Sequence, residues 1–225
     1  MDLLKKIKSR LDNYLEFDSD ELFKSSDPII FGGAIRDSIC EDPIHDVDIL
    51  AGGESARHLH HLVLSKGYFF MDSLVSKDIQ KMYSGIRVIS APKTYVKNGK
   101  IIQIITPTAS PKILELITNK PKLNRFDSRY DLNYEEVIEK LISEVDLSCC
   151  GVSYNGKEVR DRYPNAIIHS MNKVFTINEN ALMKTNRFEE RRGKLMDRGW
   201  SEITEDGNRE LILDYIINNN NEDYE

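Results

Sequence analysis

The sequence has few cysteines and no long apolar run, and these two absences narrow the class of protein. Its 225 residues contain three cysteines and one tryptophan, and two of the cysteines, Cys149 and Cys150, are adjacent. Their number and spacing form neither a disulfide framework nor a zinc-ligand pattern, so reduced, buried thiols are expected. No apolar segment approaches the ~18 residues of a transmembrane helix, and residues 1–6 lack the apolar core of a signal peptide. We therefore expect a cytoplasmic protein without a membrane partner.

The charge balance of the chain is mildly acidic. It has 31 lysines and arginines against 37 aspartates and glutamates, which gives a net charge of −6. This balance argues against tight, indiscriminate binding to nucleic acid, although a local basic cleft is compatible with it. The composition, 40% hydrophobic and 30% charged, is that of an ordinary globular protein with a sizeable core.

Hydrophobic periodicity predicts an α/β (α+β) fold, with a mixed sheet flanked by helices and a C-terminal helical extension. An amphipathic helix is predicted over Leu3–Leu15, whose leucines and isoleucine share one face. Asn98-Gly99 indicates a β-hairpin within residues 95–105. Further helices are predicted over 54–66, 111–117, 134–142 and 179–198, and further strands over 68–71, 86–89 and 143–152.

The most informative segment joins a glycine turn to two carboxylates. A short apolar run, typical of a buried strand, is stopped by Gly32 and Gly33. Residues 34–40 can form a helix whose N-terminus would favour an anion such as a triphosphate. Asp46 and Asp48 follow in a strand-like segment, where residues i and i+2 face the same side. Two such carboxylates need a cation, and Mg²⁺ usually takes one or two carboxylates together with substrate phosphates. The alternative is a tight turn beside a polar strand end.

The motif consists of Gly32-Gly33-x-x-Arg36-Asp37 and, thirteen positions after Gly33, Asp46-x-Asp48. It resembles the nucleotidyltransferase superfamily, specifically the head domain of CCA-adding enzymes and bacterial poly(A) polymerases, most strongly over residues 28–50. The resemblance implies a nucleotidyltransferase-type catalytic domain over 1–170 with a helical extension over 171–225, unless the two form one continuous domain. It also implies an NTP such as ATP as substrate and Mg²⁺ or Mn²⁺ as cofactor.

The resemblance also assigns roles to these residues. Gly33, beside Gly32, and Arg36 would contact the incoming nucleotide, and Asp46 and Asp48 would bind the catalytic metals. Asp37 is expected to be structural, capping the turn or pairing with Arg36.

A third carboxylate is implied by the same resemblance, on a neighbouring strand, where it would complete a metal site and assist deprotonation of the attacking hydroxyl. Asp146 is the leading candidate, because residues 143–152 have the character of a buried strand, where an unpaired charge is unfavourable. Glu144 lies two residues earlier on the same face and competes for the role. In the strand predicted after Gly99, Gln103 stands where a carboxylate would be wanted. The other interpretation of Asp146 is a surface or strand-edge aspartate.

A stripe of positive charge follows later in the chain. Its members recur at spacings of three and four, as on one helix face: Lys184, Arg187, Arg191, Lys194 and Arg198. Ala181, Phe188 and Leu195 repeat at seven and would dock this helix, which Gly199 ends. A basic stripe in an acidic chain predicts a polyphosphate or nucleic-acid backbone as partner. The alternative is a solvated face whose charges pair with nearby acidic residues.

The resemblance covers only part of this stripe. Lys184 and Arg187-Phe188 are similar to two arginines before a phenylalanine that contact the nucleotide in CCA-adding enzymes. The Arg-Arg-Asp segment of that family has no convincing counterpart here. Arg191, Lys194 and Arg198 are then the candidates for contact with nucleic acid.

These observations predict a metal-dependent nucleotidyltransferase that moves NMP from an NTP to a hydroxyl and releases pyrophosphate. The leading acceptor is an RNA 3′ end, although 225 residues are expected to be too few for the further helical domains that grip tRNA in the family. Alternatives are nucleotidylation of a protein or small molecule, and a module that binds nucleotide or RNA without turnover. His58, His60 and His61 are interpreted as exposed residues and not as a zinc site, because no further ligand stands at suitable spacing.

Overall fold

Seven short strands form the sheet that organises the described part of the chain. The computed structural model describes residues 2–24, 28–71, 92–106, 142, 145–178 and 188–220. In their order across the sheet, the strands are β3 (Phe69–Met71), β4 (Lys93–Lys97), β5 (Lys100–Ile105), β2 (Asp46–Leu50), β1 (Ile29–Phe31), β6 (Val152–Tyr154) and β7 (Val159–Asp161). β2 and β5 run parallel, and the other neighbouring pairs are antiparallel. The predicted mixed sheet is therefore confirmed.

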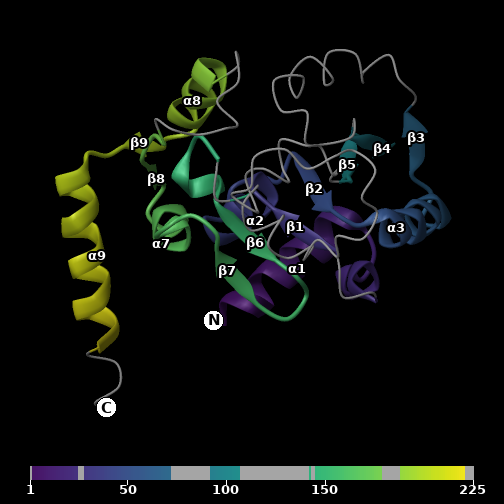
Figure 1. Cartoon of the computed structure of the whole chain (residues 1–225), viewed down its shortest axis with the longest axis horizontal. Helices are drawn as coiled ribbons and strands as arrows, with labels where there is room; N and C mark the ends of the chain where they lie inside the picture. The colour runs from purple at the N-terminus through teal and green to yellow at the C-terminus, as the bar shows by residue number, and fades with distance from the viewer. Residues whose placement is uncertain are drawn as a thin grey trace, which may run out of the picture.

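Helices from the N-terminal half pack on this sheet (Figure 1). They are α1 (Leu3–Leu15), the 3₁₀ helix η1 (Ser19–Phe23), α2 (Gly33–Ile39) and α3 (Gly53–Ser65). In α1, Ile7, Leu11 and Leu15 recur at helical spacing and are fully buried. The Asp2 carboxylate accepts a hydrogen bond from the Leu4 N–H at 3.1 Å and caps the helix. The helix predicted over Leu3–Leu15 is thus confirmed at both ends.

The predicted hairpin joins β4 to β5. Asn98 and Gly99 both have positive φ, +51° and +78°, as a two-residue turn between twisted strands requires. Lys97 and Lys100 form the last pair of the ladder. This turn fixes the register of β5, and β5 in turn pairs with β2.

The C-terminal elements include those that form a second hydrophobic cluster. These elements are η2 (Ser148–Cys150), α7 (Ala166–Met171), β8 (Val174–Phe175), α8 (Phe188–Asp197), β9 (Ser201–Glu202) and α9 (Glu205–Asn220), with β8 and β9 paired in parallel. Of these, η2, β8 and α8 contribute to the cluster. Phe188 and Leu195 of α8 are 7% and 3% exposed and pack with Phe175 and Trp200. This confirms the docking face predicted for these two residues, while Ala181 lies outside the described residues. The domain division at residue 170 stays a prediction.

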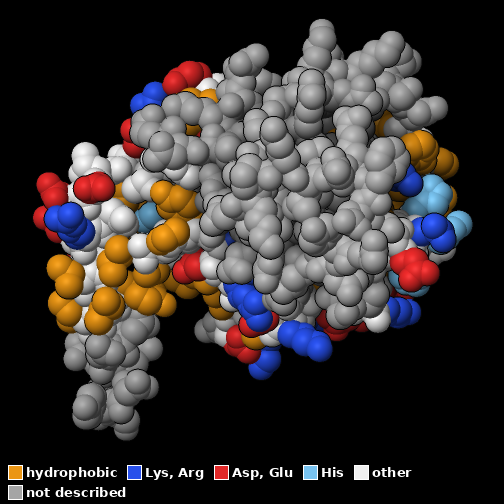
Figure 2. Space-filling view, in the orientation of Figure 1, with side chains coloured by type: hydrophobic (Ala, Val, Ile, Leu, Met, Phe, Trp, Pro, Cys, Tyr) orange, Lys and Arg blue, Asp and Glu red, His pale blue; other side chains and the backbone are white. Residues whose placement is uncertain are grey.

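α9 extends away from the sheet and is joined to the body near its N-terminal end (Figure 1). Oδ1 of Asn208 lies 2.7 Å from Nε2 of His169, whose Nδ1 lies 2.7 Å from Oγ of Ser148. The Ser148 oxygen also accepts the N–H of Thr176 at 2.9 Å. Figure 2 shows hydrophobic side chains along the rest of this helix, and those most exposed are Leu213, Ile216 and Ile217.

The strand predicted over residues 143–152 is wrong. Residues 143–144 lie outside the described residues, Leu147 forms only an isolated β-bridge, and a 3₁₀ turn follows before β6 begins at Val152. The physical reason lies at Gly151, where a Cβ atom would overlap Cβ of Tyr163. The Gly151 carbonyl also accepts the Tyr163 N–H at 2.9 Å. The chain therefore turns here, and this close backbone approach needs a glycine.

The strand predicted over 86–89 and the helix over 111–117 lie outside the described residues, as does all but Ile142 of the helix over 134–142. Among the described residues, no helix combines the length and the apolar character needed to cross a bilayer.

Candidate active site

Gly32 joins β1 to α2 in a backbone conformation that glycine alone adopts readily. Its φ and ψ are +70° and −130°, a region closed to residues with a Cβ atom. Its N–H donates to the Val152 carbonyl at 3.0 Å, and its carbonyl accepts the Arg36 N–H at 3.0 Å. A Cβ atom on Gly33 would lie 3.6 Å from Nη2 of Arg36. The turn therefore brings together Gly33 and Arg36, the two predicted nucleotide contacts.

Asp46 and Asp48 lie on one face of β2, while Val47 and Ile49 are buried on the other. Asp48 pairs with Phe31 of β1, the residue directly before the glycine turn. Burial raises the pKa of Asp46. Burial, followed by the charge of Asp46, raises the pKa of Asp48 well above its usual value. These shifts show that the metal-free site disfavours two ionised carboxylates.

One oxygen of this pair is an unsatisfied acceptor. Oδ1 of Asp48 is buried and has no hydrogen-bond partner among the described residues. A buried carboxylate oxygen without a donor is unfavourable unless a cation or water reaches it. The donors at this position are hard oxygens, which suit Mg²⁺ or Mn²⁺. The residues present therefore fit a divalent cation.

Asp146 is fully buried two residues before the start of η2, so the interpretation as a surface aspartate is wrong. It forms an ion pair with Arg191 of α8. The charge of Arg191 also lowers the pKa of Asp48, against the larger opposing effects of burial and Asp46. Arg191 is therefore near both carboxylates. The role of Asp146 as third carboxylate stays a prediction, and its competitor Glu144 lies outside the described residues.

Gln103 of β5 stands directly beside Asp48 in the parallel ladder. Residues paired in neighbouring strands project from the same face of the sheet. The structure thus places an amide beside Asp48 on the neighbouring strand, and the position of a third carboxylate stays a prediction. Its carbonyl oxygen is a metal ligand of the same hard class, but it carries no charge.

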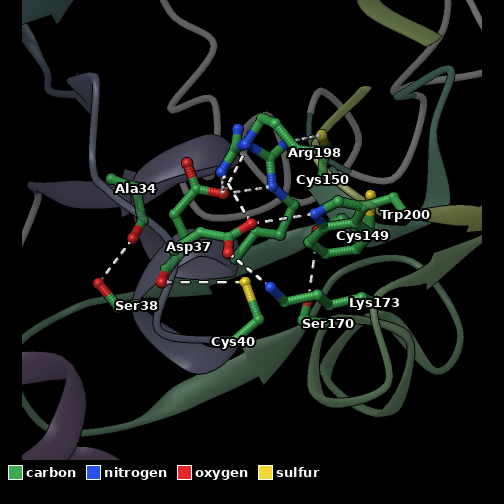
Figure 3. Close-up of polar contacts among 12 residues, drawn as sticks. Ala34, Asp37, Ser38, Cys40, Cys149, Cys150, Ser170, Lys173, Arg198 and Trp200 are labelled. Carbon is green, nitrogen blue, oxygen red and sulfur yellow. Dashed lines mark hydrogen bonds and ion pairs between the residues drawn. The ribbon is translucent and has the colours of Figure 1, made fainter. Parts of the chain in front are cut away.

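Arg36 is nearly buried, and its guanidinium contacts residues from several parts of the chain, of which Figure 3 labels Asp37, Cys150 and Trp200. Nε and Nη2 both contact Oδ1 of Asp37 at 2.7 Å, which confirms the predicted pairing of these neighbours. Nη1 donates to Sγ of Cys150 at 3.2 Å. The guanidinium carbon lies 5.4 Å from the centre of the Trp200 ring. Burial lowers the pKa of Arg36, but Cys150 and Asp37 outweigh this effect and raise it, so the charge is retained.

A second acidic group lies behind this arginine. Ligand atoms of Asp37, Cys40 and Asp42 lie within 4.8 Å of one another. Oδ1 of Asp37 also contacts Nη2 of Arg198 at 2.9 Å. Asp42 accepts hydrogen bonds from Lys173 at 2.7 Å, Arg198 at 3.0 Å and Trp200 Nε1 at 3.2 Å. Burial raises the pKa of Asp42, but the bonds from Lys173 and Trp200 and the charge of Arg198 bring it to about 2. These carboxylates are neutralised by basic side chains, so the group fits a cation less well than Asp46 and Asp48 do.

The basic stripe faces the interior more than its pattern suggested. Lys184 and Arg187 lie outside the described residues. Of the others, Arg191 pairs with Asp146 and Arg198 with Asp37 and Asp42, while Lys194 pairs with Glu190 at 2.7 Å. Among these three described members, only the Lys194 pair matches the solvated face that the alternative interpretation expected, because Arg191 and Arg198 pair with carboxylates that are buried on other elements. Contact with nucleic acid stays a prediction for them.

The histidines of α3 do not form a zinc site among the described residues. His58 and His61 are exposed, whereas Nδ1 of the half-buried His60 lies 2.7 Å from the Tyr95 hydroxyl.

Solved structures share this arrangement of strands and helices. A CCA-adding enzyme of Thermotoga maritima, in complex with tRNA, aligns with 93% of this chain at a TM-score of 0.51 and 12% identity. This chain has the fold of the CCA-adding enzymes. An apo CCA-adding enzyme aligns with 96% of the chain, at a TM-score of 0.49 and 13% identity. The chain spans 43% and 44% of the lengths of these two structures. No family model and no curated protein matches the sequence.

Sequence reasoning missed the residues that surround Arg36. The sequence predicts no contact for Trp200, the residue after the glycine that ends the basic helix, and only a reduced thiol at Cys150. Both contact a residue more than a hundred positions away in the chain. The available signal was the presence of a single tryptophan directly after a basic helix, which gives no indication of its partner.

Proposed function

We propose that the chain is a metal-dependent nucleotidyltransferase that moves NMP from an NTP to a hydroxyl acceptor and releases pyrophosphate. The observation that carries the proposal is the pair Asp46 and Asp48, which project from β2 beside the Gly32-Gly33 turn. Asp48 has a raised pKa and an unsatisfied oxygen, and both features favour a bound cation. The fold shared with a CCA-adding enzyme supports the same conclusion.

Asp46 and Asp48 would hold Mg²⁺ or Mn²⁺. When bound, the ions would activate the attacking hydroxyl and stabilise the leaving pyrophosphate. Asp146 would complete the site if Arg191 released it, whereas Gln103 already stands beside Asp48. Comparing Asp146→Asn with Gln103→Ala identifies which of them affects metal affinity.

Gly33 and Arg36 would receive the triphosphate. The permanent charge of Arg36 and its position beside the Gly33 backbone suit phosphate oxygens. Lys184 and Arg187 would neutralise phosphate or orient the base. Because phosphoryl transfer depends mainly on positioning and charge stabilisation, loss of a metal aspartate should reduce the rate far more than loss of one basic residue.

The acceptor we propose is an RNA 3′ hydroxyl in the cytoplasm. A CCA-adding enzyme of the same fold was solved with tRNA, and α8 presents basic side chains that could contact a phosphate backbone. Lys194, with a side chain 62% exposed, is the described member of the stripe most open to a phosphate backbone. Transfer to a protein or small molecule is the second candidate, because Arg191 and Arg198 are engaged in ion pairs inside the chain.

The test is incubation of the purified protein with each labelled NTP, Mg²⁺ and total cellular RNA. The control is Asp46→Asn/Asp48→Asn, with Asp206→Asn, an exposed position on α9, as a matched substitution. Label in a discrete RNA band that depends on both aspartates would support the RNA acceptor. Label on protein would favour the second candidate, and no label with any NTP would contradict the proposed function.

A further inference from the structure

The segment directly after α8 folds back over the α2 helix and covers Arg36. Trp200 is 2% exposed although it follows a surface helix, and its ring lies 5.4 Å from the Arg36 guanidinium carbon. Arg198, two residues earlier, contacts Asp37 at 2.9 Å. Figure 3 shows Arg198 and Trp200 beside Asp37 of α2. Residues 198–200, which are distant from the glycine turn in the sequence, therefore form part of its surroundings.

Contacts along two edges and over one face restrict the orientation of the Arg36 guanidinium. An arginine has five N–H donors, and here Nε, Nη2 and Nη1 contact Asp37 and Cys150 within 3.2 Å. The planar face is covered by the Trp200 ring. The Nη2 atom of Arg36 is the one that a Cβ atom on Gly33 would approach, at 3.6 Å. The donors that remain are on Nη1 and Nη2, so the guanidinium is fixed with one edge toward the glycine turn.

Trp200 is itself held in place by Asp42. Oδ2 of Asp42 accepts the indole N–H at 3.2 Å and a guanidinium N–H of Arg198 at 3.0 Å, and Oδ1 accepts Lys173 at 2.7 Å. The carboxylate is 12% exposed, so water competes weakly for these bonds. The ring thus has one orientation, and rotation away from Arg36 would break the indole hydrogen bond.

We propose that Trp200 and Arg198 are positioning residues that hold Arg36 for the triphosphate, so that the segment after α8 sets the affinity of the site for NTP. This inference rests on the proposed function. A prepositioned arginine loses less side-chain freedom when it binds phosphate than a mobile one does. The segment would thereby influence binding of the nucleotide without touching the reacting atoms.

The decisive variants are Trp200→Leu, which removes the aromatic face, and Trp200→Phe, which keeps the face and loses the N–H. Met196→Ala is the matched control, because Met196 is 49% exposed and lies in α8, just before the segment that contains Trp200. We expect Trp200→Leu to raise KM for NTP and Kd for inorganic tripolyphosphate roughly tenfold, with kcat within about twofold of wild type. Trp200→Phe should recover part of the affinity, because it keeps the aromatic face but lacks the indole hydrogen bond to Asp42, and Met196→Ala should match wild type.

Calorimetry with tripolyphosphate measures binding and requires no turnover. The Arg36 Nε–H resonance of each variant is followed by NMR. Thermal melting shows which variants are folded at the assay temperature. Equal KM and Kd in folded Trp200→Leu and wild type would overturn the inference and leave the proposed function intact. Weaker tripolyphosphate binding in Trp200→Leu, in a protein without turnover, would support the inference and contradict the function. A wild type that binds neither NTP nor tripolyphosphate would overturn both.

Discussion

Replacing Asp48 with asparagine should stabilise the metal-free protein while abolishing nucleotidyl transfer. Asp46 and Asp48 are two residues apart on one strand, which places them about 6.6 Å apart. Two unit charges at that distance repel by about 2.5 kcal/mol at an effective dielectric constant of about 20. Burial adds to this repulsion in raising the pKa of Asp48. We therefore expect Asp48→Asn to raise the free energy of unfolding by about 2 kcal/mol at a pH where both aspartates of the wild type are ionised.

The pH dependence of this difference has a defined sign. The pKa of Asp48 is raised in the folded state above its usual value of 3.8, so the folded protein binds this proton more tightly than the unfolded chain. Wild type therefore loses stability as pH rises from about 4 to the raised pKa. Asp48→Asn lacks this titration. The stability difference between the two should be small below pH 4 and should grow until the pH exceeds the raised pKa of Asp48.

The assay is thermal and urea unfolding of both proteins with EDTA and with Mg²⁺, together with turnover of labelled NTP. For a chain of this size, 2 kcal/mol corresponds to a rise of about 4–8 °C in Tm. Mg²⁺ should stabilise wild type and have little effect on the variant, because a ligand stabilises only the state that binds it. Asp214→Asn, at an exposed position of α9, is the control for loss of one charge. A destabilised variant, or one with near-normal turnover, would refute the reasoning.

Three further predictions follow from the same site. Gly32→Ala should lower the free energy of unfolding by about 1–3 kcal/mol in urea titrations, because φ of +70° strains a residue with a Cβ atom; an unchanged midpoint would contradict this. The Cys149 hydrogen bond and the Arg36 charge lower the pKa of Cys150 to about 6. Alkylation of Cys150 by iodoacetamide should therefore rise with pH around that midpoint, and Arg36→Met should move the midpoint upward. Mass spectrometry of the labelled peptide measures the midpoint in both proteins. Gln103→Glu should tighten Mg²⁺ binding by adding a carboxylate beside Asp48, and calorimetry showing equal or weaker binding would exclude Gln103 from the metal site.

The N-terminal part of the fold, up to the β4–β5 hairpin, could be predicted because its signals are local. The amphipathic face of Leu3–Leu15, the Asn98-Gly99 turn and the alternation through Asp46 and Asp48 each depend on residues close in the sequence. Helical and strand periods report which side chains share a face. In these elements one face is apolar enough to leave a single choice of which side is buried.

The second half was harder because its elements are determined by distant partners. The strand predicted over residues 143–152 is interrupted by the packing of Gly151 against Tyr163, which no local pattern encodes. The spacing of Arg191 and Arg198 indicates a helix face, but not that buried carboxylates lie opposite it. The environment of Arg36 could not be predicted for the same reason.

The hydrogen-bonded series Ser148, His169 and Asn208 has a consequence for assigning enzymes by template matching. Its two 2.7 Å contacts reproduce the nucleophile, base and orienting amide of a hydrolase. Ser148 and His169 are 0% and 1% exposed, and the serine oxygen accepts the Thr176 N–H, so no ester or peptide carbonyl can reach it. A search for hydrolytic triads that used interatomic distances alone would therefore misclassify this chain, and a requirement for solvent access to the serine oxygen would remove the error.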